Sequence, residues 1–438
     1  MRFKIIGMLL VVLLLGAACS SDKDTTDEGT GGDDTAANTG TVSVFNAMEP
    51  EEGEALQGII DELINADSDY VATIETSGAF EEQAKIRIEG GNPPDVMMYP
   101  QPGAVIELAR SGDAVALEDL GMDVAQMEEQ FGEYFMSLGE FEGKHYGVPT
   151  NINLKSMVWY PKDDFDAAGY EVPATWEELL ALSDQILADG STPWCVGYES
   201  DTATGWPATD WMEDIVLRTA GVDVYDKWVT HEIPFNDPAI VAAGETFGDL
   251  MFADGYVLGG ADQTPAINFG DAPGPMFDDP PKCWLHRQAN FINAFFPKDA
   301  EAGTDYDWFP LPPIDQEGTL FAGELSVIFR NAPEVKDFIE QFAGEEVQCE
   351  GGATTASSRI SPNIDVGPDC YANDILSGAS AVLTDSLAND TGRFDASDLM
   401  PSAVGAGSFW TGMVKYMQEG PDSLQGVLDE IEASWPAE

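Results

Sequence analysis

The sequence predicts an α/β protein with two or more domains. From residue 42 onward, strand-like and helix-like segments alternate in the order βαβαβα, which is typical of a parallel sheet covered by helices. The chain has 438 residues, 44% of them hydrophobic and ten of them Trp, so it can bury a large core. A length of this size exceeds that of one typical domain.

The first region follows from hydrophobic spacing. In residues 51–65, Leu56, Ile60 and Leu63 recur at the three- and four-residue intervals of a helix face. The Asn92-Pro93-Pro94 segment interrupts the pattern before the third strand. We expect strands at 42–48, 71–76 and 95–99, and helices at 51–65, 80–89 and 103–110.

A second α/β region follows. Thr175 is a good N-cap with Glu178 three residues later, so a helix is expected from there through Leu187. The Pro-rich segment 309–314 is expected to cross between domains, and the remainder is mostly helical. The other expected strands are 146–150, 156–160, 194–198 and 324–330, and the other helices are 210–219, 238–253 and 422–434.

Cys19 stands between two contrasting segments. Before it, an apolar run of eleven residues, 5–15, is too short for the roughly 20 residues of a membrane span, so residues 1–18 are expected to be a signal peptide. After it, residues 20–41 contain only small and polar side chains and predict a disordered tether. The junction resembles the lipobox of bacterial lipoproteins, in which the cysteine is acylated, although Gly16 stands where Leu is usual. The alternative is ordinary cleavage after Ala17-Ala18.

Export would place the remaining cysteines in an oxidising compartment. Disulfides are then the expected state of Cys195, Cys283, Cys349 and Cys370. Four cysteines allow three pairings, and the sequence leaves them open. No close C-x-x-C pair indicates a metal site.

The formal net charge is −60, which repels nucleic acid and anionic lipid headgroups and argues against both as direct partners. The acidic residues are spread along the chain and indicate a generally acidic surface.

Three motifs carry a resemblance to a known family. They are Asn92-Pro93-Pro94-Asp95-Val96, the segment 143–149 followed by 158–162 (GKHYGVP and VWYPK), and the segment 173–179 (PATWEEL). Their order and spacing resemble the extracellular solute-binding proteins of carbohydrate ABC importers, of the maltose- and α-glucoside-binding type. The resemblance covers the chain from residue 42 to its end.

The resemblance implies a two-lobed periplasmic-binding-protein fold, type II-like, with hinge-crossing strands and a sugar bound between the lobes. Lobe 1 would comprise 42–150 plus 313–355, and lobe 2 would comprise 151–312 plus 356–438, with crossings near Thr150, Pro312 and Thr355. Lobe closure around a ligand is a hinge motion. The implied protein is a monomeric, exported, lipid-anchored subunit without enzymatic activity or cofactor. It would face the extracellular or periplasmic side and work with permease subunits and a separate ATPase, since the sequence has no G-x-x-x-x-G-K-[ST] phosphate loop.

A sugar presents apolar C–H faces and a rim of hydroxyls, so its site needs flat aromatic rings together with planar acids and amides. Trp410, in the Phe409-Trp410 pair, is similar to the stacking Trp of maltodextrin-binding proteins, whereas Val414 replaces an arginine that the family uses. The other candidates lie in expected ligand loops or on the crossing segment: Asn46, Glu49, Tyr99, Asn151, Glu199, Trp206, Asp278 and Arg287.

Two other functions remain open. A binding protein of the same fold could carry a polyamine or a metal ion, which the net charge superficially suits. A secreted glycosidase could use paired carboxylates and cleft aromatics. Aromatic and amide-rich loops favour a neutral polyol as ligand over a polyamine or a metal ion. Acidic residues are so abundant that a pair such as Asp278-Asp279 is no evidence for a glycosidase.

Overall fold

The computed structural model describes residues 40–354 and 358–437. The expected signal peptide, Cys19 and almost all of the tether therefore lie outside the described residues. Within the described ranges, no helix is both long enough and apolar enough to cross a membrane.

The first of two main sheets has six strands in the order β12-β11-β3-β1-β2, with β6 also pairing with β11. Strands β1, β2 and β3 are parallel, as the βαβαβα pattern predicts, whereas β11 runs antiparallel to β3 and β6. The strands are β1 (Gly40–Asn46), β2 (Tyr70–Thr76), β3 (Val96–Tyr99), β6 (Val148–Leu154), β11 (Thr319–Ile328) and β12 (Gly392–Phe394).

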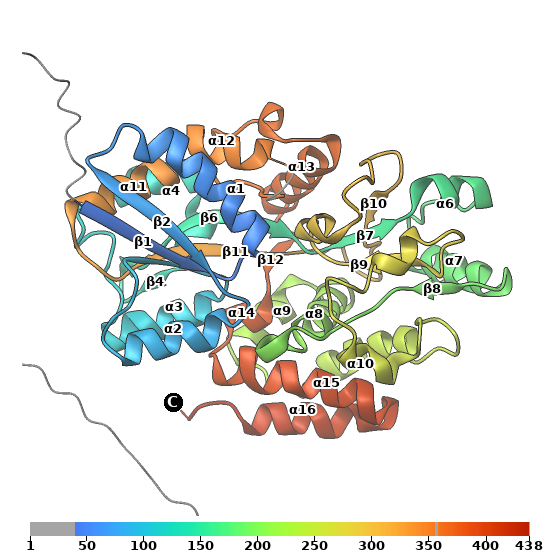
Figure 1. The fold of residues 1–438 in the computed structure, drawn as a ribbon. Coiled ribbons are helices and arrows are strands. Elements are labelled where there is room, and N and C mark those ends of the chain that lie inside the picture. The colour runs from blue at the N-terminus through green and yellow to red at the C-terminus, as the bar shows by residue number, and fades with distance from the viewer. Residues whose placement is uncertain (1–39, 355–357, 438) are drawn as a thin grey trace, which may run out of the picture. The chain divides into compact units, whose positions relative to one another are not determined.

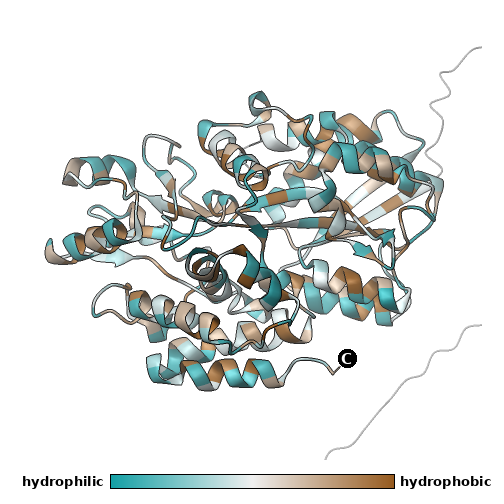
Figure 2. Cartoon of the chain, turned by 180° about the vertical axis from the view of Figure 1, so that it is seen from behind, coloured by the Kyte–Doolittle hydropathy of each residue, from teal (hydrophilic) through white to brown (hydrophobic). Residues whose placement is uncertain are grey.

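Helices cover both faces of this sheet (Figure 1). On one face, α1 (Pro50–Ile60) and α11 (Pro333–Phe342) bury Leu56 and Phe338 against Val44. On the other face, α2 (Phe80–Glu89) and α3 (Pro102–Ser111) bury Phe80 and Val105. In Figure 2 the helices show brown and teal sides, which is the amphipathic pattern that such packing requires.

The second sheet has four strands in the order β10-β7-β9-β8. They are β7 (Met157–Tyr160), β8 (Thr192–Trp194), β9 (Cys283–Arg287) and β10 (Asp307–Pro310). A large apolar core joins this sheet to α7 (Trp176–Ala188), α8 (Trp206–Ala220) and α10 (Pro238–Met251). The Thr175 hydroxyl accepts a hydrogen bond from the Glu178 N–H, so the expected N-cap of α7 is confirmed.

The remaining elements are short strands and helices around the two sheets. The strands β4 (Glu140–Phe141) and β5 (Lys144–His145) form a small hairpin. The helices are α4 (Val124–Phe131), α5 (Glu133–Ser137), α6 (Lys162–Ala168), α9 (Val222–Val229), α12 (Glu345–Ala353), α13 (Asp374–Ala388), α14 (Ala396–Leu399), α15 (Trp410–Glu419) and α16 (Leu424–Ala433).

The chain passes between the sheets at definite points. Strand β6 stays in the first sheet as far as Leu154, and β7 begins in the second sheet at Met157, so the passage lies at Lys155 and Ser156, a few residues beyond the expected crossing near Thr150. The return passage lies between β10 and β11, which belong to different sheets. The third expected crossing, near Thr355, falls at residues 355–357, outside the described residues.

The four cysteines of the described residues form two disulfides. Cys195 bonds to Cys283 and links β9 to the segment after β8, and Cys349 bonds to Cys370 across a separation of 21 residues. The expectation of disulfides is confirmed, and the pairing that the sequence left open is resolved.

Candidate binding site

A pocket of about 1120 Å³ lies between the elements of the two sheets. Helix α1 and strands β6 and β11 supply one wall, and the start of α8, the segment 291–302 and the start of α15 supply the opposite wall. Its volume slightly exceeds the roughly 300–1,000 Å³ usual for small-molecule sites.

The wall from the first sheet is polar. Asn151 on β6 is paired in register with Glu324 on β11, and Glu52 on α1 lines the same side of the pocket. Behind them, Arg359 donates a hydrogen bond from Nη2 to the Thr150 carbonyl at 2.7 Å. Its Nη1 lies 3.7 Å from Glu324 Oε2 and 4.0 Å from Glu52 Oε1. The Arg359 guanidinium therefore lies within ion-pairing distance of both the Glu324 and the Glu52 carboxyl groups.

This wall has spare hydrogen-bonding capacity. Burial raises the pKa of Glu52 to about 8, outweighing the lowering effect of Arg359, so Glu52 is protonated at neutral pH and can donate a hydrogen bond. Burial also raises the pKa of Glu324. Among the described residues, the buried Asn151 Oδ1 and Glu324 Oε2 have no hydrogen-bond partner. Buried polar atoms without a hydrogen-bond partner are rare in folded proteins, and a bound ligand can supply the missing partner.

The opposite wall is aromatic. Trp206 packs edge to face against Phe269, with 5.2 Å between ring centroids, and lies 5.9 Å from Phe291. Trp410 lines the same pocket and is 5% exposed. Gly205, directly before Trp206, allows the chain to approach the Trp410 backbone closely, because a Cβ at this position would lie 2.3 Å from the Trp410 carbonyl oxygen. Its φ of 114° is also unfavourable for any side chain.

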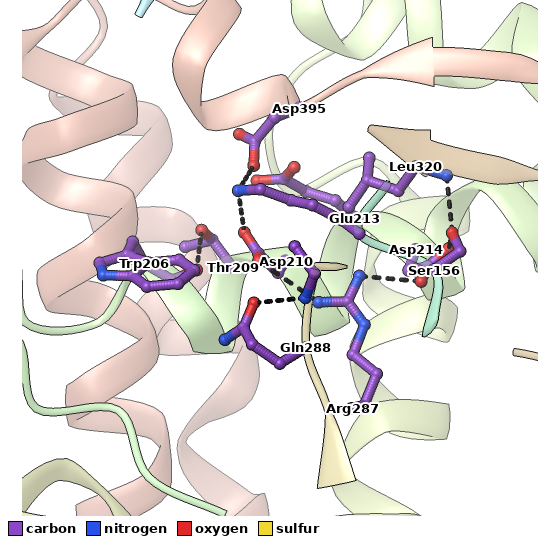
Figure 3. A network of polar contacts seen from close by, with 12 residues as sticks. Ser156, Trp206, Thr209, Asp210, Glu213, Asp214, Arg287, Gln288, Leu320 and Asp395 are labelled. Atoms are coloured by element: carbon purple, nitrogen blue, oxygen red, sulfur yellow. Dashed lines mark hydrogen bonds and ion pairs between the residues drawn. The ribbon is translucent and has the colours of Figure 1, made fainter. Parts of the chain in front are cut away.

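Buried charges support the aromatic wall from behind (Figure 3). Lys155 Nζ donates to Asp210 Oδ1 at 2.8 Å and to Asp395 Oδ2 at 2.6 Å, and it lies 5.1 Å from the centre of the Trp206 ring. The two carboxylates share one ammonium, and their pKa values are shifted in opposite directions. Despite burial, Lys155 lowers the pKa of Asp395 to about 2, whereas burial raises that of Asp210. Lys155 thus connects the passage between the sheets to α8 and Trp206.

Of the residues proposed from sequence, Glu49, Asn151, Trp206 and Trp410 line the pocket. The other five do not. Tyr99 packs edge to face against Phe80 beneath the first sheet, and the Asn46 side chain is buried, with its Oδ1 accepting from the Met48 N–H. Glu199 accepts hydrogen bonds from the Asn268 side chain and the Asp201 N–H, next to the lining residue Ser200.

The remaining two are held by ion pairs elsewhere. Asp278 is 2.7 Å from Lys282 at the surface, with 44% of its side chain exposed. Arg287 is fully buried on β9, where its Nη2 lies 2.8 Å from Asp214 Oδ2 (Figure 3). Every residue of β9 is buried, so a cation on this strand needs a partner from the same core, and Asp210 and Asp214 on α8 provide it.

Several lining residues escaped the sequence reasoning. One group consists of aromatic residues in segments without regular periodicity: Phe269, Phe291, Phe295, Phe296 and Tyr306. The other consists of single charged residues: Glu52, Glu81, Lys155, Glu324 and Asp398. The FINAFF run at residues 291–296 was the one signal available, since it gathers three aromatics between strands. No group of three His, Cys, Asp or Glu side chains suited to hold a metal ion occurs in the described part of the chain.

Comparison with known proteins decides the family. The model of the family "Bacterial extracellular solute-binding protein" matches residues 49–348. The chain belongs to this family. The osmoprotective compounds-binding protein GgtB of Synechocystis is 37% identical over 439 residues, covering 100% of both chains. The alpha-glucosides-binding periplasmic protein AglE of Rhizobium meliloti is 38% identical, covering 90% of this chain and 87% of its own.

Solved structures support the same fold. The bacterial solute receptor AcbH superposes on this solute-binding protein with a TM-score of 0.74 at 18% identity, covering 90% of this chain and 98% of its own. The maltose-bound MalE3 of T. maritima gives a TM-score of 0.70 at 16% identity, covering 90% and 100%. The two-lobed binding-protein fold expected from the motifs is therefore confirmed, and the chain is a solute-binding protein of an ABC importer.

Proposed function

We propose that this protein captures an α-glucoside or a maltooligosaccharide in the pocket between the two sheets and delivers it to the permease of its importer. The observation that carries the proposal is the pairing of an aromatic wall with a polar wall across one pocket. Trp206 and Trp410 offer flat faces for sugar C–H groups, and Asn151, Glu324 and Glu52 offer groups for hydroxyls.

The division of the chain supports capture by closure. We take the six-stranded sheet with its helices as lobe 1 and the four-stranded sheet with its helices as lobe 2, joined through Lys155–Ser156 and the β10–β11 segment. Lining residues come from both lobes, so a ligand in the pocket would contact both and favour their approach. We further propose acylation at Cys19, a 22-residue tether to the membrane, a monomeric state and a separate ATPase subunit as partner.

The relatives favour a glucoside over other sugars. AglE is named for binding α-glucosides and GgtB for binding osmoprotective compounds, and both align over most or all of this chain. Neighbours of the same fold are described in complex with raffinose and with maltose.

Isothermal titration calorimetry against maltose, maltotriose, trehalose and sucrose tests the proposal. Spermidine in the same panel tests the polyamine alternative, and thin-layer chromatography of the sugars after long incubation tests for glycosidase activity. We expect heat with at least one glucoside, none with spermidine, and unchanged sugars. Heat with spermidine alone would refute the proposal.

A matched pair of variants locates the site. Trp206→Ala should weaken binding of the responding sugar about 10- to 100-fold, because removal of one stacking ring costs roughly 1–3 kcal/mol. Trp435→Ala is the control, since Trp435 stacks on His231 and does not line the pocket. Equal loss of affinity in both variants would place the site elsewhere.

A further inference from the structure

The charge of the pocket lining is strongly one-sided. Seven carboxylates line it, and among the described residues the only lining cations are Lys155 and Lys298. The carboxylates are Glu49, Glu51, Glu52, Glu81, Glu301, Glu324 and Asp398.

Both lysines are already paired with carboxylates. Lys155 is held between Asp210 and Asp395, and Lys298 lies 3.0 Å from Glu51 at the exposed rim. The nearby Arg359 is 4% exposed and is occupied by the Thr150 carbonyl and two glutamates. Among the described residues, the cations in or beside the pocket lining are therefore all paired, and none is left to receive an anionic ligand.

Besides Glu324 Oε2, two polar groups in the lining, on Asp398 and Asn151, lack a hydrogen-bond partner within the described ranges and mark where a ligand would bind. Asp398 is 6% exposed, and its carboxylate oxygens receive no hydrogen bond from the described residues. Asn151 is 3% exposed, and its Oδ1 is likewise unpaired. These acceptors match the hydroxyl or ammonium donors of a ligand and would oppose the oxygens of a carboxylate or phosphate.

We propose that the pocket selects its glucosides by charge: amine-bearing sugars bind more tightly than neutral ones, and sugars that carry a carboxylate or phosphate are rejected. The inference rests on the proposed sugar-binding function and adds the class of glucoside that the site accepts.

The physical reason is that a ligand anion would lose its hydrating water in the pocket without gaining a cationic partner there. A ligand carboxylate in this pocket would lose water and gain no cationic partner, while it faced the oxygens of Asp398 and Glu324. Burial and neighbouring acids raise the pKa of Asp398, and burial raises that of Glu52, so these groups can stay neutral beside an uncharged sugar. A ligand ammonium would stabilise their ionised forms and would bind with release of a proton.

The test uses isosteric ligands on trehalose and on maltose. In each, one 6-hydroxyl is replaced by an amine, a carboxylate or a carboxamide, and binding is measured by calorimetry at pH 7 in two buffers of different ionisation enthalpy. We expect the carboxylate to bind at least 100-fold more weakly than the carboxamide of the same shape, and the amine about tenfold more tightly than the parent sugar, with proton release. Higher salt should reduce the difference in affinity between the carboxamide and the carboxylate only slightly, because salt screens buried charges poorly.

Two variants assign the effect to the pocket. Asp398→Asn combined with Glu52→Gln should remove the tenfold preference for the amine over the parent sugar, together with the proton release, because neither new side chain can ionise. Asp262→Asn, at an exposed position outside this pocket, should leave both unchanged. Circular dichroism confirms that each variant is folded. Equal affinity for carboxylate and carboxamide would overturn the charge selection and leave the proposed function intact, whereas no heat with either parent sugar or any derivative would count against both.

Discussion

The two walls of the pocket handle polar groups in opposite ways. The wall from the first sheet places polar side chains at the pocket surface and leaves some of their atoms without a hydrogen-bond partner among the described residues, as at Asn151 Oδ1 and Glu324 Oε2. The wall from the second sheet presents aromatic rings and keeps its charges behind them, with Lys155, Asp210 and Asp395 bonded to one another. Unpaired polar groups suit direct contact with a ligand, whereas paired charges suit support of the residues that make contact.

Removal of Lys155 should have the largest effect on stability. Lys155→Met leaves the fully buried Asp210 and Asp395 facing each other without their shared ammonium. Loss of one partner from a buried ion pair costs roughly 3–5 kcal/mol. Urea unfolding monitored by circular dichroism should report this loss in the free energy of unfolding.

The control for this prediction is Lys162→Met. Lys162 pairs with Asp166 one helical turn away at 2.8 Å, on a partly exposed helix. Such pairs contribute about 0.2–0.5 kcal/mol. If Lys155→Met were as stable as Lys162→Met, the charges behind the aromatic wall would not form the supporting network described above.

The contrast between the walls also explains what the sequence could predict. The first strands and helices followed from local periodicity, and helix α2 (Phe80–Glu89) begins and ends at the expected residues. Trp206 and Trp410 were found because flat rings in ligand loops carry a recognisable chemistry. Arg287 was expected at the ligand and instead pairs with Asp214, 73 residues away, because such long-range pairing leaves no trace in local sequence. Phe269 has no distinguishing neighbours and resembles an ordinary core residue.

Glu52 provides a test of the polar wall through pH. Its folded-state pKa of about 8 lies above the ordinary value of 4.5, so the folded protein holds this proton more firmly than the unfolded chain. The stabilisation is fully present below pH 4.5 and is lost as pH rises through about 8. The wild type should therefore lose about 1–2 kcal/mol more than Glu52→Gln across this window, after allowance for screening.

The measurement is urea unfolding at a series of pH values on both proteins, with the difference between the two curves as the readout. Other acids titrate in both, so the difference isolates Glu52. Parallel curves would show that Arg359 keeps Glu52 ionised, and the polar wall would then present a carboxylate where a neutral hydrogen-bond donor is expected.

The smallest effect is expected where the two walls meet at the rim. Lys298 reaches across to Glu51 at 3.0 Å, but 83% and 73% of these side chains are exposed. Exposed pairs contribute about 0–1 kcal/mol because water and salt screen them. Lys298→Ala should therefore change neither the free energy of unfolding nor the affinity for a neutral glucoside by more than this amount, and added salt should abolish the difference. A larger, salt-resistant loss of affinity would mean that the rim pair is desolvated when ligand binds, and that contact across the rim, as well as the buried walls, holds the ligand in place.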